Sequence, residues 1–127
     1  MIDLKRAILT MLEEHSVSFT MKPIDFPFSE RLMMAIVMPA NDDSLRDIEF
    51  YKAKDATTDT AISVLEYSIN PLEPTSRDRT NLISTRHYEL ADQREYNALD
   101  EYLKERCSGK RMIVEFHASD SLDYEWA

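Results

Sequence analysis

Apolar residues recur with helical spacing in two segments of the chain. The first stripe consists of Leu4, Ala7, Ile8, Met11 and Leu12. Asp3 stands just before this stripe, where a carboxylate can cap the free N–H groups of a helix. The second stripe consists of Tyr96, Leu99, Leu103 and Cys107, with Gly109 at the position of a left-handed cap. These patterns predict one helix from residue 4 to about His15 and another over about 92–107.

Alternating apolar and polar residues predict strands elsewhere. Ile48 and Phe50 alternate with Glu49 and Tyr51, which predicts a half-exposed strand. We expect it to pair with a strand over 61–69, across the connection at 55–59. Two more strands are predicted over 82–90 and 112–117. The alternation over 122–126 is typical of an edge strand, or of an acidic tail at 118–127.

The run from Leu32 to Met38 is ambiguous because all seven of its residues are apolar. Such a run fits a strand buried on both faces, but Ser29 could also cap a short helix there. We favour the strand. The order is then helix, several strands, helix, and one or two strands. It predicts an α+β fold with a small antiparallel or mixed sheet and both helices packed on one face.

Length and composition indicate one compact domain over 1–127. Hydrophobic residues make up 43% of the chain and charged residues 31%, which is typical of a globular protein. Cys107 is the one cysteine, which favours a reducing compartment. The N-terminus has no signal-peptide pattern, and the longest apolar run is far shorter than the roughly 20 residues that span a bilayer. We therefore expect a cytoplasmic protein that does not bind membranes.

The charge balance excludes several functions. The chain has 15 Lys and Arg against 24 Asp and Glu, a net charge of −9. Direct nucleic-acid binding is not expected, because it depends on Lys and Arg that displace counterions from phosphates. Gly109 is the single glycine, so the chain has neither a P-loop nor a dinucleotide-binding fingerprint, both of which need several glycines.

No catalytic motif is present. Cys107 would lie at the negative end of a helix dipole, where a thiolate is disfavoured, so a buried structural thiol is the preferred interpretation. The densest group of candidate metal ligands is Glu115, His117, Asp120 and Asp123. A solvated strand face followed by an acidic turn explains this group better than a metal site, because its spacing matches no ligand motif. We expect no cofactor, no metal and no enzymatic activity.

The remaining candidate is an acidic face for a protein partner. Its residues on the second helix are Asp92, Glu95, Asp100, Glu101 and Glu105, and those of the tail are Asp120, Asp123, Tyr124, Glu125 and Trp126. Aromatic residues often dominate interfaces, so Tyr96 and Tyr102 are further contact candidates. Met33, Met34 and Met38 are interpreted as core residues rather than as a pliable binding surface.

In composition the chain resembles small, acidic, glycine-poor α+β proteins, such as immunity proteins, antitoxins and phage-encoded inhibitors of host defence. No motif carries this resemblance. It favours a binding or inhibitor protein that docks on a basic protein, such as one that binds nucleic acid. The alternative is a structural or assembly subunit, for example of a phage particle, that self-associates through apolar edges. A metal-dependent protein using His117 is the third hypothesis.

Overall fold

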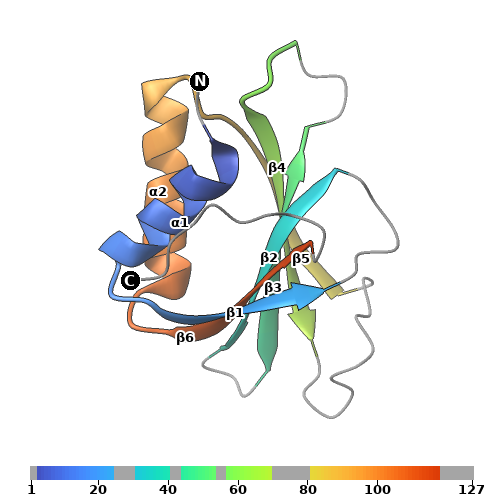
Figure 1. Cartoon of the computed structure of the whole chain (residues 1–127), viewed down its shortest axis with the longest axis vertical. Coiled ribbons are helices and arrows are strands. Elements are labelled where there is room, and N and C mark those ends of the chain that lie inside the picture. The colour runs from blue at the N-terminus through green and yellow to red at the C-terminus, as the bar shows by residue number, and fades with distance from the viewer. Residues whose placement is uncertain (1–2, 25–30, 41–43, 54–56, 70–80, 118–127) are drawn as a thin grey trace.

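A computed structural model describes residues 3–24, 31–40, 44–53, 57–69 and 81–117 (Figure 1). These residues form helix α1 (Leu4–Glu14), strands β1 (Ser18–Ile24), β2 (Leu32–Pro39), β3 (Leu45–Lys52), β4 (Ala61–Ile69) and β5 (Leu82–Glu89), helix α2 (Gln93–Cys107) and strand β6 (Arg111–His117). The predicted tail strand at 122–126 lies outside the described residues.

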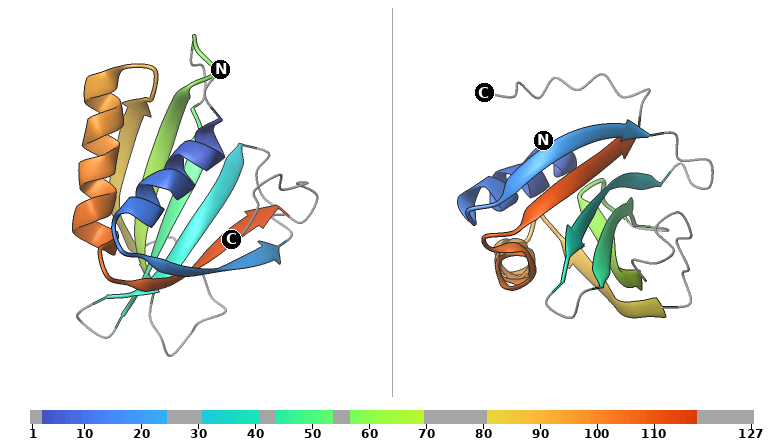
Figure 2. Two further views of the ribbon diagram at one scale, coloured as in Figure 1. Left: turned by 60° about the vertical axis from the view of Figure 1, so that its left-hand side comes forward. Right: turned by 90° about the horizontal axis from the view of Figure 1, so that it is seen from below.

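The six strands form one mixed sheet in the order β1-β6-β2-β3-β4-β5. β1 and β6 are parallel, and the other neighbouring pairs are antiparallel. Figure 2 shows α1 and α2 side by side against one face of this sheet. The predicted α+β fold, with an N-terminal helix and a second helix near the C-terminus on the same face, is confirmed.

Both helices begin at an aspartate cap, of which the one at Asp3 was predicted. Asp3 accepts a hydrogen bond from the Arg6 N–H, and Asp92 accepts one from the Arg94 N–H. Each cap satisfies one of the free donors in the first turn of its helix. Gly109 follows α2 with a φ of 71°, a left-handed conformation that favours glycine. The helix boundaries thus follow from local sequence signals.

The main core lies between the two helices and the sheet. α1 buries Leu4, Ile8, Leu9, Met11 and Leu12, and α2 buries Leu99, Tyr102, Leu103 and Cys107. Met33, Met34 and Met38 pack in this core, as predicted. The prediction that Tyr102 contacts a partner was wrong, because its ring is 4% exposed and lies within the same core. Tyr96 is partly buried against it.

The ambiguous apolar run is a strand, as predicted. β2 lies between β6 and β3, so it has neighbours along both edges and is buried on both faces. A fully apolar run suits this position because neither face meets water. β3 and β4 also pair as expected, with Ile48 opposite Glu66 and Phe50 opposite Val64.

Two details of the sheet differ from the sequence predictions. β1, which contains Pro23, was not among the predicted strands. The strand tolerates proline because β1 lies at the edge of the sheet, where one N–H row has no ladder partner. β3 is not half-exposed: Asp47, Glu49 and Tyr51 are buried on the face away from the helices. There Tyr51 packs with Leu32 in a second, smaller apolar cluster, and its hydroxyl donates to Glu49.

Neither α1 nor α2, the helices within the described segments, has the length and apolar character needed to cross a membrane.

Candidate functional site

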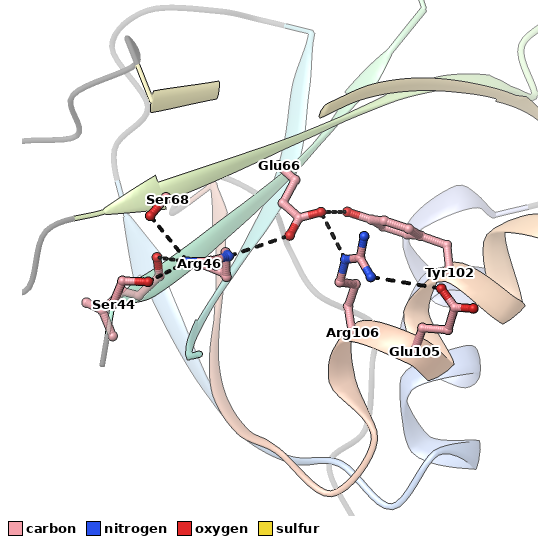
Figure 3. A network of polar contacts seen from close by, with 8 residues as sticks. Ser44, Arg46, Glu66, Ser68, Tyr102, Glu105 and Arg106 are labelled. Atoms are coloured by element: carbon pink, nitrogen blue, oxygen red, sulfur yellow. Dashed lines mark hydrogen bonds and ion pairs between the residues drawn. The ribbon is translucent and has the colours of Figure 1, made fainter. Parts of the chain in front are cut away.

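Glu66 is the centre of a charged network between the sheet and α2 (Figure 3). Its carboxylate is buried, with the residue 2% exposed. The Tyr102 hydroxyl donates to Glu66 Oε1 at 2.8 Å, and Arg106 Nε donates to the same oxygen at 3.2 Å. Arg46 Nε lies 3.7 Å from Oε2. Burying an unpaired carboxylate costs several kcal/mol, and these partners offset that cost for Glu66.

Strand register and helix spacing bring these four side chains together. Ile62, Val64 and Glu66 alternate along β4 and point toward the helices. Arg46 lies diagonally opposite Glu66 on β3. Tyr102 and Arg106 are one helical turn apart on α2 and therefore share a face. Burial raises the pKa of Tyr102 and the Glu66 carboxylate raises it further, so the phenol remains a neutral donor.

A pocket with a volume of about 400 Å³ opens beside this network. We call it the Glu66 pocket. Its lining consists of Met38, Pro39, Ala40, Arg46, Glu66, Ile83, Glu105, Arg106 and Lys110. The volume lies within the range of small-molecule sites. The charged side chains come from β3, β4 and α2, with Lys110 just before β6.

A second feature is the junction between the end of α1 and the middle of α2. His15 Nε2 lies 2.7 Å from Asp100 Oδ1, and the Gly109 N–H donates to the His15 carbonyl at 3.3 Å. Four acidic residues either take part in this contact or lie within two residues of one of its partners in the sequence. These residues, called the acidic junction below, are Glu13, Glu14, Asp100 and Glu101.

The charges of α1 oppose its helix dipole. Lys5 and Arg6 lie in its first turn, whereas Glu13 and Glu14 lie in its last turn. A helix is stabilised by the reverse arrangement, as in α2, which has Glu95 in its first turn and basic residues in its last. The acidic end of α1 therefore weakens the helix, and the buried face of α1 must compensate.

The structure separates the residues of the predicted acidic face. Asp92 caps α2, Glu95 is half-buried, and Asp100 bonds to His15. Glu101 and Glu105 are exposed, but Glu105 borders the Glu66 pocket. The other predicted residues, which lie outside the described residues, are Asp120, Asp123, Tyr124, Glu125 and Trp126.

Sequence reasoning missed the role of Glu66. Glu13 and Glu14 are exposed at the end of α1, and no local pattern shows that this end meets α2. Glu66 did carry a signal: it is an acid in phase with the buried residues Ile62 and Val64. An acid at a core position of an alternating strand is typical of a buried ion pair.

The structure also places the candidate metal ligands. Glu115 and His117 share one side of β6, as expected from strand alternation, and His117 Nε2 lies 2.8 Å from the Leu32 carbonyl oxygen. Asp120 and Asp123 lie outside the described residues. Within the described segments, no three His, Cys, Asp or Glu side chains converge closely enough to hold a metal ion.

The Cys107 thiol is buried at the end of α2, as predicted. Burial raises its pKa to about 12, and the Glu66 carboxylate contributes to the increase. The thiolate is the nucleophile that attacks thiol reagents, so at about pH 8 the native protein should react roughly a thousandfold more slowly than the unfolded chain. Labelling with and without denaturant measures this ratio. Native labelling within tenfold of the unfolded rate would contradict the buried position.

Comparisons with protein-family models, with curated proteins and with solved structures found no match.

Proposed function

We propose that the protein is a small cytoplasmic binding or inhibitor protein, of the immunity, antitoxin or phage anti-defence kind, that docks the acidic junction on a basic protein partner. The partner class that fits best is a nucleic-acid-binding protein, whose own binding surface is basic. The observation that carries the proposal is the contact between His15 and Asp100, which brings the acidic end of α1 against the middle of α2, where Asp100 and Glu101 lie.

The charge arrangement of α1 supports this proposal. Glu13 and Glu14 weaken the helix whose dipole they oppose, so its stability does not explain them. Docking does explain them, because a concentrated negative surface speeds association with a basic partner. The proposed surface therefore differs from the one expected from α2 alone: it keeps Asp100 and Glu101 and adds the end of α1.

Charge reversal at the acidic junction tests the proposal. The tagged protein is used to capture partners from a lysate of its source cell, with Glu14→Lys and Glu101→Lys as test variants. Asp59→Lys is the matched control, because it makes the same change of net charge in the turn before β4. We expect both junction variants to bind the captured partner about tenfold more weakly. Asp59→Lys should bind within about twofold of the wild type.

The salt dependence provides a second readout of the same complex. Association through the junction should slow as salt rises, because salt screens exposed charges. A partner retained by all three variants, or lost equally from all three, contradicts the proposed surface.

Glu14→Lys should at the same time stabilise the free protein. A lysine at the C-terminal end of α1 interacts favourably with the helix dipole, which predicts a gain of about 0.5 kcal/mol in the free energy of unfolding. Thermal unfolding at low salt measures it, with Asp59→Lys again as the control. A loss of stability would show that Glu14 is part of the packing of α1, and the docking argument from the dipole would fail.

A second candidate, the assembly subunit, is supported by one observation. β5 is an edge strand of the described sheet, and its Leu82 and Ile83 are 45% and 47% exposed. Exposed apolar edge strands favour pairing with another chain. Sedimentation at high protein concentration would then show salt-insensitive oligomers. Ile83→Lys should dissociate them, whereas Ile113→Lys, at an equally exposed isoleucine of an interior strand, should not. A wild-type protein that remains monomeric rules out this candidate.

A further inference from the structure

We propose that the Glu66 pocket binds a small organic carboxylate with a short hydrocarbon body. This proposal goes beyond docking on a protein partner and does not depend on it. It rests on the volume of the pocket, on the charges of its lining and on the way in which Arg106 is held.

The lining of the pocket is cationic in a chain that is acidic overall. Three cationic side chains, Arg46, Arg106 and Lys110, face the carboxylates of Glu66 and Glu105. The lining residues that the structure describes thus carry one net positive charge, whereas the whole chain has a net charge of −9. One additional monoanion makes the site neutral. A dianionic phosphate would leave an excess negative charge, so the charge balance favours a carboxylate.

Arg106 provides the donors for this anion. Its Nε bonds to the buried Glu66, and its guanidinium carbon lies 5.4 Å from the centre of the Tyr102 ring. These two contacts fix the plane of the guanidinium. Among the described residues, the polar partner of its terminal nitrogens is Glu105. The distance from Arg106 Nη1 to Glu105 Oε2 is 3.9 Å, which exceeds hydrogen-bond length. A guanidinium fork held in this way matches a carboxylate through two parallel hydrogen bonds.

The apolar part of the pocket lining suits a hydrocarbon. Met38, Pro39 and Ile83 belong to it, and Ile83 is one of the exposed large hydrophobic side chains of the protein. A ligand that covers Ile83 gains the free energy of apolar burial in addition to the ion pair. The combination of a fixed guanidinium and an apolar wall is what selects a carboxylate with a short apolar body.

Glu105 acts as an internal competitor for this site. Its side chain is 69% exposed and lies close to Arg106 without a hydrogen bond, so an incoming carboxylate can displace it at little cost. Removing its charge should therefore strengthen binding. This direction is opposite to what a purely structural role of Glu105 predicts.

The test is a titration of the full chain with hexanoate, followed by the NMR signals of residues 105–110 and of the Arg106 guanidinium. Hexanamide, which has the same hydrocarbon body without the charge, is the matched control ligand. Inorganic phosphate is the second control ligand, and it tests whether the pocket prefers a monoanion to a dianion. We expect hexanoate to bind at least about tenfold more tightly than either control, because a charge-assisted pair adds to apolar contact.

Three variants assign the binding to the pocket. Glu105→Gln should bind hexanoate about threefold more tightly, as expected for loss of an exposed competing charge. Arg106→Gln should bind about tenfold more weakly. Because Arg106→Gln also breaks the contact with Glu66, Lys110→Gln provides a variant that leaves this contact intact, and it should weaken binding as well. Equal binding of hexanoate and hexanamide, or variants that bind like the wild type, would overturn the proposal.

Discussion

Replacing Glu66 with glutamine is expected to lower the free energy of unfolding by about 3 kcal/mol. Glutamine has nearly the same size, so the change leaves no cavity and removes mainly the negative charge. Arg46 and Arg106 then lose the carboxylate that compensates them. The loss should lie at the low end of the range for broken buried pairs, because the two arginine side chains are 20% and 36% exposed and remain partly hydrated. Urea unfolding followed by far-UV circular dichroism measures the difference.

Glu105→Gln is the matched control for this prediction. It makes the same chemical change in the same network, but at an exposed side chain whose contact with Arg106 is long, at 3.9 Å. An exposed pair of this kind contributes little, so the expected loss is below about 0.5 kcal/mol. If both variants unfold at the same urea concentration, Glu66 does not stabilise the fold through its arginines, and the network would have to be explained as a feature of the pocket alone.

Local signals in the sequence were sufficient for most of the elements. The apolar stripes defined both helices, with the Asp3 cap at the start of the first, and the strand predicted over 61–69 has the same boundaries in the structure. The signals failed where position in the sheet decides the outcome. Pro23 disrupts the interior of a helix but is tolerated at the edge of the sheet, where β1 lies, so β1 was not predicted.

The candidate sites were harder to predict because they depend on distant contacts. His15 and Asp100 are 85 residues apart, so a pattern within either helix cannot show that the end of α1 meets the middle of α2. The predicted face on α2 contained half of the acidic junction for this reason. The Glu66 pocket likewise combines residues from several elements, and only the phase of Glu66 within β4 was visible locally.

The burial of β3 shows that a local pattern also does not reveal what covers the face of a strand. Alternation of Ile48 and Phe50 with polar residues normally indicates one solvated face. Here Asp47 and Glu49 are also buried, and the Tyr51 hydroxyl donates to Glu49. Strand periodicity reports which residues share a face but not what covers that face, so it could not distinguish a solvated face from a second apolar cluster.

Phe50→Ala is expected to cause the largest loss of stability, about 3 to 5 kcal/mol. Phe50 is fully buried in the main core, and it is one of the largest of the buried side chains. Alanine removes the ring and leaves a cavity that a strand with neighbours on both edges cannot close by moving. Urea unfolding measures the loss, and Phe50→Leu should retain part of the stability because it fills part of the cavity.

Ile113→Ala separates the effect of burial from that of residue type. Ile113 lies on β6, within the sheet, but its side chain faces away from the helices and is 42% exposed. Its truncation removes apolar atoms from a central strand without opening a cavity, so the expected loss is within about 0.5 kcal/mol. A comparable loss at both positions would mean that stability depends on apolar residues of the strands regardless of face. The core between the helices and the sheet would then not be the main source of stability.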